Sequence, residues 1–336
     1  MRIAQISTMS APVRQQSGGS VESWLWLLTR ELGRLGHEVT VFATADSNLP
    51  CGQLVATMPG PYGDPGSLDD WYLCEWLNLA RAIERSGEFD LLHAHSYLWS
   101  LPLASLAHRP MVHTTHIVPD ENAARLWSMH PSATVTALSA HQWSAYPHLK
   151  PAAIIPHGVD DRQFTFRPQP DDYVCYLGRF VSGKGPIQAI DIARRLGVRL
   201  LMAGPPNAYF RERVQPLVDG KTVEYVGYLT GADRDRFLGG ARALLYPIQF
   251  PEAFGLVLVE AMFCGTPVAA MRLGAVPEIV EESVTGFTTT KEHELLDACA
   301  RCFTLDRSVI SKKTRQRFSA ERMAREYVRL YETVAA

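Results

Sequence analysis

Residues 251–270 read PEAFGLVLVEAMFCGTPVAA, which is the most informative stretch of the chain. A long apolar run ends at Gly265, the residue type that often follows a helix, and Pro267 opens a second, short apolar run. This pattern predicts a helix followed at once by a buried strand. Because helices that alternate with buried strands are typical of parallel sheets, an α/β fold is expected.

The same alternation extends from this stretch towards both ends of the chain. Short apolar runs predict strands, and longer runs with apolar residues at helical spacing predict helices. Strands are predicted at 2–8, 38–44, 90–95, 111–116, 134–139, 153–156, 173–177, 199–203, 223–228, 243–246 and 267–270. Helices are predicted near 21–35, 68–86, 99–107, 120–129, 140–147, 186–196, 207–218, 231–240 and 255–264, with a helical tail from 291 onward.

One polar, proline-bearing segment, residues 159–172, interrupts this alternation and is interpreted as a linker. Because the pattern restarts beyond it, two Rossmann-like, doubly wound domains are predicted, with limits at 1–160 and 161–318. Ligands of open α/β sheets bind beyond the carboxyl ends of the strands. Two such sheets facing each other would therefore enclose a cleft for the ligand.

Composition narrows the class of partner. The chain has 336 residues, 33 Lys and Arg, 35 Asp and Glu, and a formal net charge of −2. This balance argues against nucleic acid, because phosphate backbones are bound by basic surfaces. Neither a signal peptide nor a membrane-spanning run is found, and the six cysteines show no disulfide spacing, so a cytoplasmic protein is expected. A peripheral contact with the inner face of a membrane stays open.

Two glutamates in the opening stretch are candidate ligand-binding residues. Apolar residues surround Glu260, so its carboxylate is expected to be partly buried and to need a partner. The two hydroxyls of a sugar diol would serve, and so would a backbone amide or an arginine in a purely structural role. Glu252 precedes the helix, where the helix dipole favours an acid. Between the glutamates, Ala253-Phe254-Gly255-Leu256 leaves the helix-start amides free to meet an anion.

Two glycine-bearing loops follow predicted strands. GRFVSGKG at 178–185 places Arg179 and Lys184 before a helix, which suits a diphosphate, although loop cations are often merely solvated. The order of residues is not that of a P-loop. The other loop, SGGS at 17–20, contains Gly18 and Gly19, which would let the backbone approach a ligand or simply form a tight turn.

Four histidines, His93, His95, His113 and His116, lie at the ends of two neighbouring predicted strands. Histidines so placed could bind zinc. Only some of the four would point the same way, however, so no metal ion is expected. The DRD at 233–235 superficially matches a metal-binding DxD, but it lies at a polar helix start, where capping explains it.

Together these motifs resemble the retaining GT-B glycosyltransferases, the large family that includes sucrose synthase and phosphatidylinositol mannosyltransferase. The most specific parts are GRFVSGKG and the E-x7-E signature formed by Glu252 and Glu260. Supporting parts are SGGS, HTTH at 113–116, IIPHGVD at 154–160 and GAVPEIVEESVTGF at 274–287. The resemblance covers nearly the whole chain. It implies the GT-B fold, two Rossmann-like domains facing across a cleft, with a last helix at 319–336 that returns to the first domain.

The resemblance also implies roles at the donor site. Arg179 and Lys184 would hold the diphosphate of a nucleotide-sugar and stabilise the charge that develops on it. Glu260 would accept hydrogen bonds from the ribose, and Glu252 would bind a hydroxyl of the transferred sugar. Amides near 253–256 would face the distal phosphate or the sugar.

The remaining roles fall elsewhere in the sequence. Gly18 and Gly19 would let the first domain close on the diphosphate, and His116 would lie beside the sugar on the acceptor side. The nucleotide base is expected near Tyr228 and Leu229. Departures from the family pattern are Ala253, where many relatives have proline, and Gly274-Ala275, where Gly-Gly is familiar.

The expected activity is transfer of a hexose-type sugar from a nucleotide-diphosphate sugar, UDP rather than GDP, to an acceptor hydroxyl. No cofactor or metal is expected. The acceptor is a sugar, a glycan, a lipid-linked sugar or a small metabolite. A nucleotide-sugar epimerase and a non-catalytic nucleotide-sugar-binding subunit stay open as alternatives. An NAD-dependent oxidoreductase is disfavoured, because no G-x-G-x-x-G follows the first strand.

Overall fold

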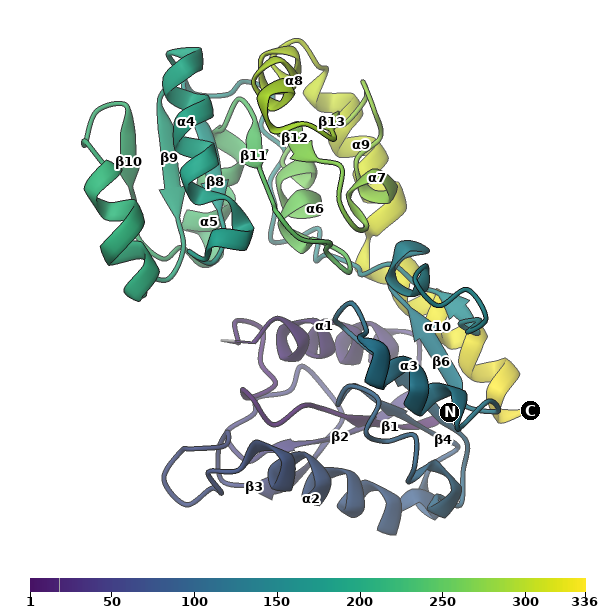
Figure 1. The fold of residues 1–336 in the computed structure, drawn as a ribbon. Helices are drawn as coiled ribbons and strands as arrows, with labels where there is room; N and C mark the ends of the chain where they lie inside the picture. The colour runs from purple at the N-terminus through teal and green to yellow at the C-terminus, as the bar shows by residue number, and fades with distance from the viewer. Residues whose placement is uncertain (18) are drawn as a thin grey trace. The chain divides into compact units, whose positions relative to one another are not determined.

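Each of two units in the computed structural model is built around one parallel sheet (Figure 1). The structure describes residues 1–17 and 19–336, so the predicted site residue Gly18 lies outside the described residues. The first unit comprises Met1–Gly158 and Ala320–Ala336, and the second comprises Val159–Ser319. The limits expected from the sequence, 1–160 with 319–336 and 161–318, differ from these by one or two residues.

The first unit contains a seven-stranded sheet in the order β3-β2-β1-β4-β5-β6-β7, with parallel pairing throughout. The strands are β1 (Arg2–Ile6), β2 (Glu38–Thr44), β3 (Gln53–Met58), β4 (Leu91–Ala94), β5 (Met111–Thr114), β6 (Thr134–Ala137) and β7 (Ala153–Ile154). The strand order reverses direction between β1 and β4. Ligands of such sheets bind beyond the carboxyl ends of the strands at this reversal.

Helices cover both faces of this sheet. They are α1 (Ser20–Arg34), α2 (Trp71–Glu84), α3 (Glu121–Ser128) and α10 (Ala320–Ala335). Strand side chains alternate between the faces. Ile3 therefore joins a core with residues of α1 and α10, whereas Ala4 joins a core with residues of α2. Burial on both faces explains why the strands read as continuous apolar runs.

The second unit contains a six-stranded parallel sheet in the order β10-β9-β8-β11-β12-β13. Its strands are β8 (Val174–Leu177), β9 (Leu200–Ala203), β10 (Val223–Tyr225), β11 (Leu244–Tyr246), β12 (Val268–Met271) and β13 (Gly286–Thr289). Its α-helices are α4 (Pro186–Leu196), α5 (Gly231–Gly240), α6 (Leu256–Phe263), α7 (Val276–Ile279), α8 (Leu295–Cys302) and α9 (Arg307–Phe318). The strand order reverses between β8 and β11, which places a second ligand-binding edge there.

The predicted elements differ from the observed ones in a few places. Strands β3 and β13 were not predicted, and the predicted helices at 99–107 and 140–147 are reduced to the single 3₁₀ turns Ala104–Leu106 and His141–Trp143. Pro102 and Pro147 lie inside those two segments, where proline removes a helical N–H donor. The predicted linker is an ordered part of the second unit, where the Arg167 N–H donates to the Cys264 carbonyl.

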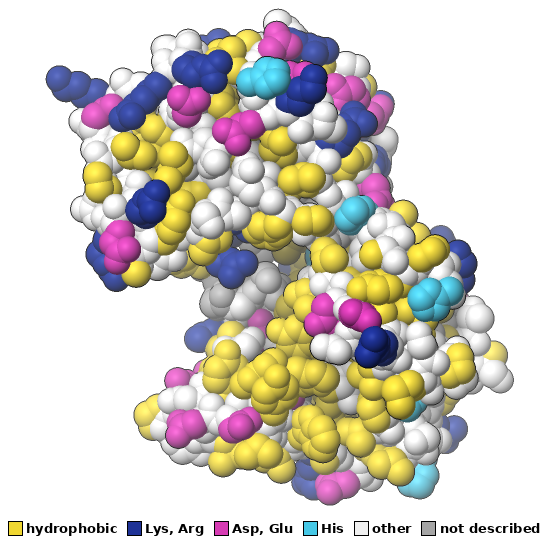
Figure 2. All heavy atoms as spheres, in the orientation of Figure 1, with side chains coloured by type: hydrophobic (Ala, Val, Ile, Leu, Met, Phe, Trp, Pro, Cys, Tyr) yellow, Lys and Arg dark blue, Asp and Glu magenta, His cyan; other side chains and the backbone are white. Residues whose placement is uncertain are grey.

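Apolar side chains remain exposed along α2. Tyr72, Leu73, Trp76 and Leu77 are each about half exposed, and hydrophobic side chains gather on the visible face of the first unit in Figure 2. Among the described residues, no helix combines the length and the apolar character needed to cross a bilayer. This finding does not test the cytoplasmic location, which stays a prediction.

Candidate functional site

Two loops meet at the strand reversal in the second unit. Residues 178–185 follow β8 and residues 247–255 follow β11. The Gln249 N–H donates to the Gly183 carbonyl at 2.8 Å. Gly185 has a φ of +68°, and a Cβ there would lie 2.0 Å from the Pro247 carbonyl oxygen. Glycine at this position is what allows the two loops to approach each other so closely.

An ion pair joins the two loops. The Lys184 ammonium contacts the Glu252 carboxylate, and both side chains are only 15% exposed. The ammonium also lies 5.7 Å from the ring centre of Tyr246 and 5.2 Å from that of Phe250. Burial and the neighbouring Glu252 charge hold the pKa of Tyr246 well above its usual range. The structure thus brings two of the predicted site residues together in a water-poor environment, where charges interact strongly.

The start of α6 lies in the second of these loops. Gly255 precedes the helix with a φ of +100°, and Ala253 and Phe254 are buried beside it. The first amides of a helix have no intrahelical partner and lie at the positive end of its dipole. Arg179, on the loop that carries Lys184, is exposed. Among the predicted donor-site residues of this loop pair, Arg179 alone is exposed to solvent.

The second glutamate of the signature has an arginine as its partner. Arg234 of α5 forms an ion pair with Glu260 of α6, with side chains 31% and 12% exposed. Of the partners considered from the sequence, which were a sugar diol, a backbone amide and an arginine, the structure contains the arginine. Tyr228, on the loop that leads to α5, is 58% exposed, and Leu229 is partly buried. Sequence reasoning treated Arg234 only as part of a capping segment and missed this contact.

The loop after β12 fixes the backbone of Glu252. The Ala275 N–H donates to the Glu252 carbonyl at 2.9 Å, and a Cβ on Gly274 would lie 2.2 Å from the Glu252 nitrogen. Gly274 has a φ of +62°, whereas Ala275 has a φ of −76°. Only the first of the two positions therefore requires glycine, which explains why alanine is accommodated at the second.

This geometry predicts a large effect for Gly274→Ala. The matched control is Gly197→Ala, because Gly197 has a similar φ of +66° with no atom within 4 Å of an added Cβ. Backbone strain alone is expected to cost about 1 kcal/mol in the control. Gly274→Ala must in addition displace Glu252, so a loss of about 3 kcal/mol is expected in urea denaturation. Equal losses in the two variants would contradict the close approach.

Gly19 is placed at the start of α1 in the first unit. It is the residue before the helix, and a Cβ there would lie 1.8 Å from a carboxylate oxygen of Glu22. The buried Glu22 therefore folds back over this glycine. Whether Gly19 also faces a ligand stays a prediction.

Three histidines pack against Trp24 of α1. His116 Nε2 lies 3.2 Å from His95 Nδ1, and its ring stacks on His157 at 5.3 Å between centres, with Trp24 against all three. Burial lowers the pKa of His116 to about 3, so the ring is neutral at pH 7. Within residues 1–17 and 19–336, no group of His, Cys, Asp or Glu has an arrangement suited to a metal ion.

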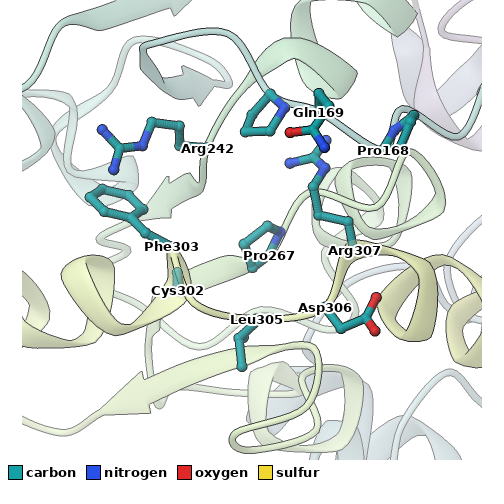
Figure 3. A pocket seen from close by; sticks show the side chains of 10 residues that line it. Pro168, Gln169, Arg242, Pro267, Cys302, Phe303, Leu305, Asp306 and Arg307 are labelled. Carbon is teal, nitrogen blue, oxygen red and sulfur yellow. The ribbon is translucent and has the colours of Figure 1, made fainter.

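A cavity of about 320 Å³ in the second unit is lined by Pro168, Gln169, Arg242, Phe303 and Arg307, among others (Figure 3). Its arginines are already engaged. Arg307 donates to the carbonyls of Arg167, Gly239 and Ala241, and Arg242 lies 3.9 Å above the ring of Phe303. The Arg307 hydrogen bonds hold the start of α9 to the rest of the unit, and we assign the cavity no ligand.

Two family models match the chain. The model described as Glycosyl transferases group 1 matches residues 160–321, and the one described as Glycosyltransferase Family 4 matches residues 18–163. The chain is 27% identical to D-inositol 3-phosphate glycosyltransferase of Mycobacterium avium, over 85% of this chain and 81% of the relative. It is 28% identical to the protein of the same name from Saccharomonospora viridis, over 100% of this chain and 94% of the relative.

Solved structures share the fold along almost the whole chain. Sucrose-phosphate synthase from Thermosynechococcus elongatus superposes with a TM-score of 0.80 at 20% identity, covering 99% of this chain and 98% of that one. HepE from Anabaena, solved in complex with UDP and glucose, superposes with a TM-score of 0.74 at 19% identity, covering 99% and 100%. These likenesses confirm the predicted α/β architecture of two Rossmann-like domains.

Proposed function

The chain belongs to the glycosyltransferases of the GT-B fold, and we propose that it moves a hexose from a UDP-sugar to an acceptor hydroxyl with retention of configuration. The observation that carries this proposal is the meeting of Lys184, Glu252 and the start of α6 at the strand reversal of the second unit. A cation and free helix amides there suit a diphosphate. Glu260, at the other end of α6, suits the ribose diol.

The reaction breaks the bond between the anomeric carbon and the donor phosphate, and negative charge builds on the departing UDP. Lys184, Arg179 and the amides of Gly255 and Leu256 would stabilise that charge. We propose that they take the place of a divalent cation. The acceptor hydroxyl would attack from the face that the phosphate leaves and pass its proton to that phosphate.

In the proposed complex, the ion pairs of the ligand-free site open. Lys184 would turn from Glu252 to the diphosphate, which frees Glu252 for a hydroxyl of the transferred sugar. Arg234 would likewise release Glu260 to the ribose. Lys184 would exchange one negatively charged partner for another, so its largely buried ammonium stays paired with and without ligand.

UDP as the donor nucleotide is supported by the HepE structure, which was solved with UDP. The exposed Tyr228 and the neighbouring Leu229 are proposed to lie against the base. The proteins matched over most of the chain carry glycosyltransferase names, which favours transfer over epimerisation or mere binding. Those relatives are named for an inositol phosphate acceptor, and we infer that a hydroxyl-bearing ring is also the acceptor here.

Thermal denaturation in the presence of nucleotides tests this proposal. UDP at one hundred times its dissociation constant should stabilise the protein by about 2.7 kcal/mol. For a domain of this size the midpoint should rise by roughly 5 °C or more. The shift should persist with a chelator present, and GDP should give a smaller one.

Three outcomes would contradict parts of the proposal. A larger shift with GDP would overturn the base assignment, and loss of the UDP shift on chelation would overturn metal independence. If no nucleotide or nucleotide-sugar shifted the midpoint, the donor site itself would be wrong.

A further inference from the structure

Tyr246 is the last residue of β11, at the strand reversal where the loops 178–185 and 247–255 meet. Its side chain is only 4% exposed. Among the described residues, its hydroxyl has no hydrogen-bond partner. A buried polar group without a partner destabilises the folded protein, so its presence in this loop pair needs a physical reason.

Two other buried tyrosines of the second unit have hydroxyls that are hydrogen-bonded. Tyr173 donates to the Phe237 carbonyl at 2.8 Å, and Tyr176 of the neighbouring strand β8 donates to the Arg179 carbonyl at 3.1 Å. Tyr246 therefore differs from both in having a free donor.

The hydroxyl of Tyr246 lies close to the start of α6 and to Glu252. A Cβ on Gly255 would lie 3.5 Å from the phenol oxygen. After the larger effect of burial, the charge and the hydrogen-bonding capacity of Glu252 raise the pKa of Tyr246 further. The carboxylate is thus near the hydroxyl without completing a hydrogen bond to it. At pH 7 the phenol keeps its proton and is available as a donor.

Lys184 occupies Glu252 in the ligand-free site. An ammonium is a stronger partner for a carboxylate than a neutral hydroxyl, because both members of the pair are charged. The same ammonium lies 5.7 Å from the ring centre of Tyr246, within the range of attraction between a cation and an aromatic ring. In this state Tyr246 contributes its ring to the lysine, and its hydroxyl stays unpaired.

Departure of Lys184 towards a diphosphate would leave the Glu252 carboxylate largely buried without its cation. The backbone of Glu252 is fixed, because Ala275 N–H donates to its carbonyl and Gly274 packs against its nitrogen. Only the side chain can adjust. A buried donor without a partner, the hydroxyl of Tyr246, lies beside it.

We propose that Tyr246 is a positioning residue of the donor site: its hydroxyl donates to the Glu252 carboxylate when Lys184 turns to the diphosphate, and so holds that carboxylate towards the transferred sugar. This inference rests on the proposed function, because the diphosphate of the donor is what draws Lys184 away. Lys184 and Tyr246 are then alternative partners of one carboxylate. The hydrogen bond that is missing in the empty site forms in the occupied one.

Thermal denaturation without ligand tests the exchange of partners. Tyr246→Phe keeps the ring and removes a hydroxyl that bonds to nothing, so the midpoint should equal or exceed that of the wild type. In a Lys184→Met background the hydroxyl should already donate to Glu252. There, Tyr246→Phe should lower the midpoint by roughly 3 °C or more. A purely structural role of Tyr246 would not reverse the sign of its effect between the two backgrounds.

The matched control is Tyr173→Phe. It also removes a buried phenol hydroxyl from the second unit, but that hydroxyl is bonded to the Phe237 carbonyl, outside the two loops. Tyr173→Phe should therefore lower the midpoint by the same amount in the wild-type and Lys184→Met backgrounds.

Isothermal titration with UDP connects the exchange of partners to the donor. Tyr246→Phe should weaken UDP binding about tenfold or more, because the hydrogen bond between Tyr246 and Glu252 forms only in the complex. Tyr173→Phe should leave the affinity for UDP unchanged.

The outcomes separate this inference from the proposed function. If Tyr246→Phe lowered the midpoint as much as Tyr173→Phe in the wild-type background, the hydroxyl would already be bonded in the empty site and the inference would be wrong. It would also be wrong if Tyr246→Phe had no effect in the Lys184→Met background, or if it left UDP binding unchanged. If UDP bound to none of the proteins while the reversal of sign persisted, the proposed function would fail and the exchange between Lys184 and Tyr246 would stand.

Discussion

Lys184→Ala is expected to lower kcat for sugar transfer by at least about a hundredfold, the usual loss when one group that stabilises transition-state charge is removed. The ammonium lies in a site that is only 15% exposed, beside the first turns of α4 and α6. Negative charge on the departing UDP would be poorly screened by water there. The kcat should be measured with a UDP-sugar and the best acceptor, together with the affinity for UDP.

The control for this prediction is Lys313→Ala. Lys313 forms an ion pair with Glu281 at 2.6 Å in the same unit, with side chains 41% and 38% exposed. That pair is more exposed and outside the two loops, so its loss should leave kcat unchanged and cost little stability. Lys184→Arg should recover part of the activity, because it restores a cation. A kcat for Lys184→Ala within threefold of wild type would refute the phosphate assignment.

Acid is expected to unfold the first unit before the second. Burial lowers the pKa of His113 and His116 to about 3, and it holds the pKa of His93, His95 and His157 well below the usual value. Of the 11 histidines, only His293 belongs to the second unit. The burial of neutral histidines is therefore concentrated in one half of the chain.

The sign of this effect follows from proton uptake. A histidine with a lowered pKa in the native state binds its proton only after unfolding, so stability is fully present above pH 6.5 and is lost as the pH falls towards 3. At pH 5, His113 and His116 should each lower the free energy of unfolding by about 2 kcal/mol relative to its value at neutral pH. The three further histidines add losses of the same sign. Together these losses approach the whole free energy of unfolding of a domain.

Hydrogen exchange at pH 7 and pH 5 would measure the effect for each unit. Amides of β1, β4 and β5 should lose protection at pH 5, whereas those of β8, β11 and β12 should keep it. His113→Gln should reduce the pH dependence by removing a titrating group, and the exposed His108→Gln should leave it unchanged. Equal loss of protection in both units would show that the buried histidines do not control acid stability.

Much of the fold could be predicted from local sequence patterns. The alternation of short apolar runs with helical segments predicts the two parallel sheets. A strand of such a sheet is buried on both faces, so its sequence is a continuous apolar run. The short edge strands β3 and β13 were missed. In β3 only Met58 is buried, whereas Leu54 and Val55 are partly buried and Ala56 is exposed, so the same physical signal is weak.

The candidate donor site was assembled largely from local motifs as well. Lys184 and Glu252 each lie in a glycine-bearing loop beyond a strand, and such loops are recognisable because close backbone approach requires glycine. Their direct contact joins residues far apart in the chain, which no local pattern encodes. The same holds for Arg234 and Glu260, which come from two different helices.

Tyr246 shows where sequence reasoning stopped short. It ends the apolar run ALLY at 243–246, which predicts a buried strand and gives no sign of a polar role for the hydroxyl. The sequence by itself determined the class of fold and the family, and it predicts the loops that would bind a diphosphate. Folding in three dimensions set which charges pair, which buried hydroxyl lacks a partner and which histidines are neutral, because those properties depend on desolvation by residues distant along the chain.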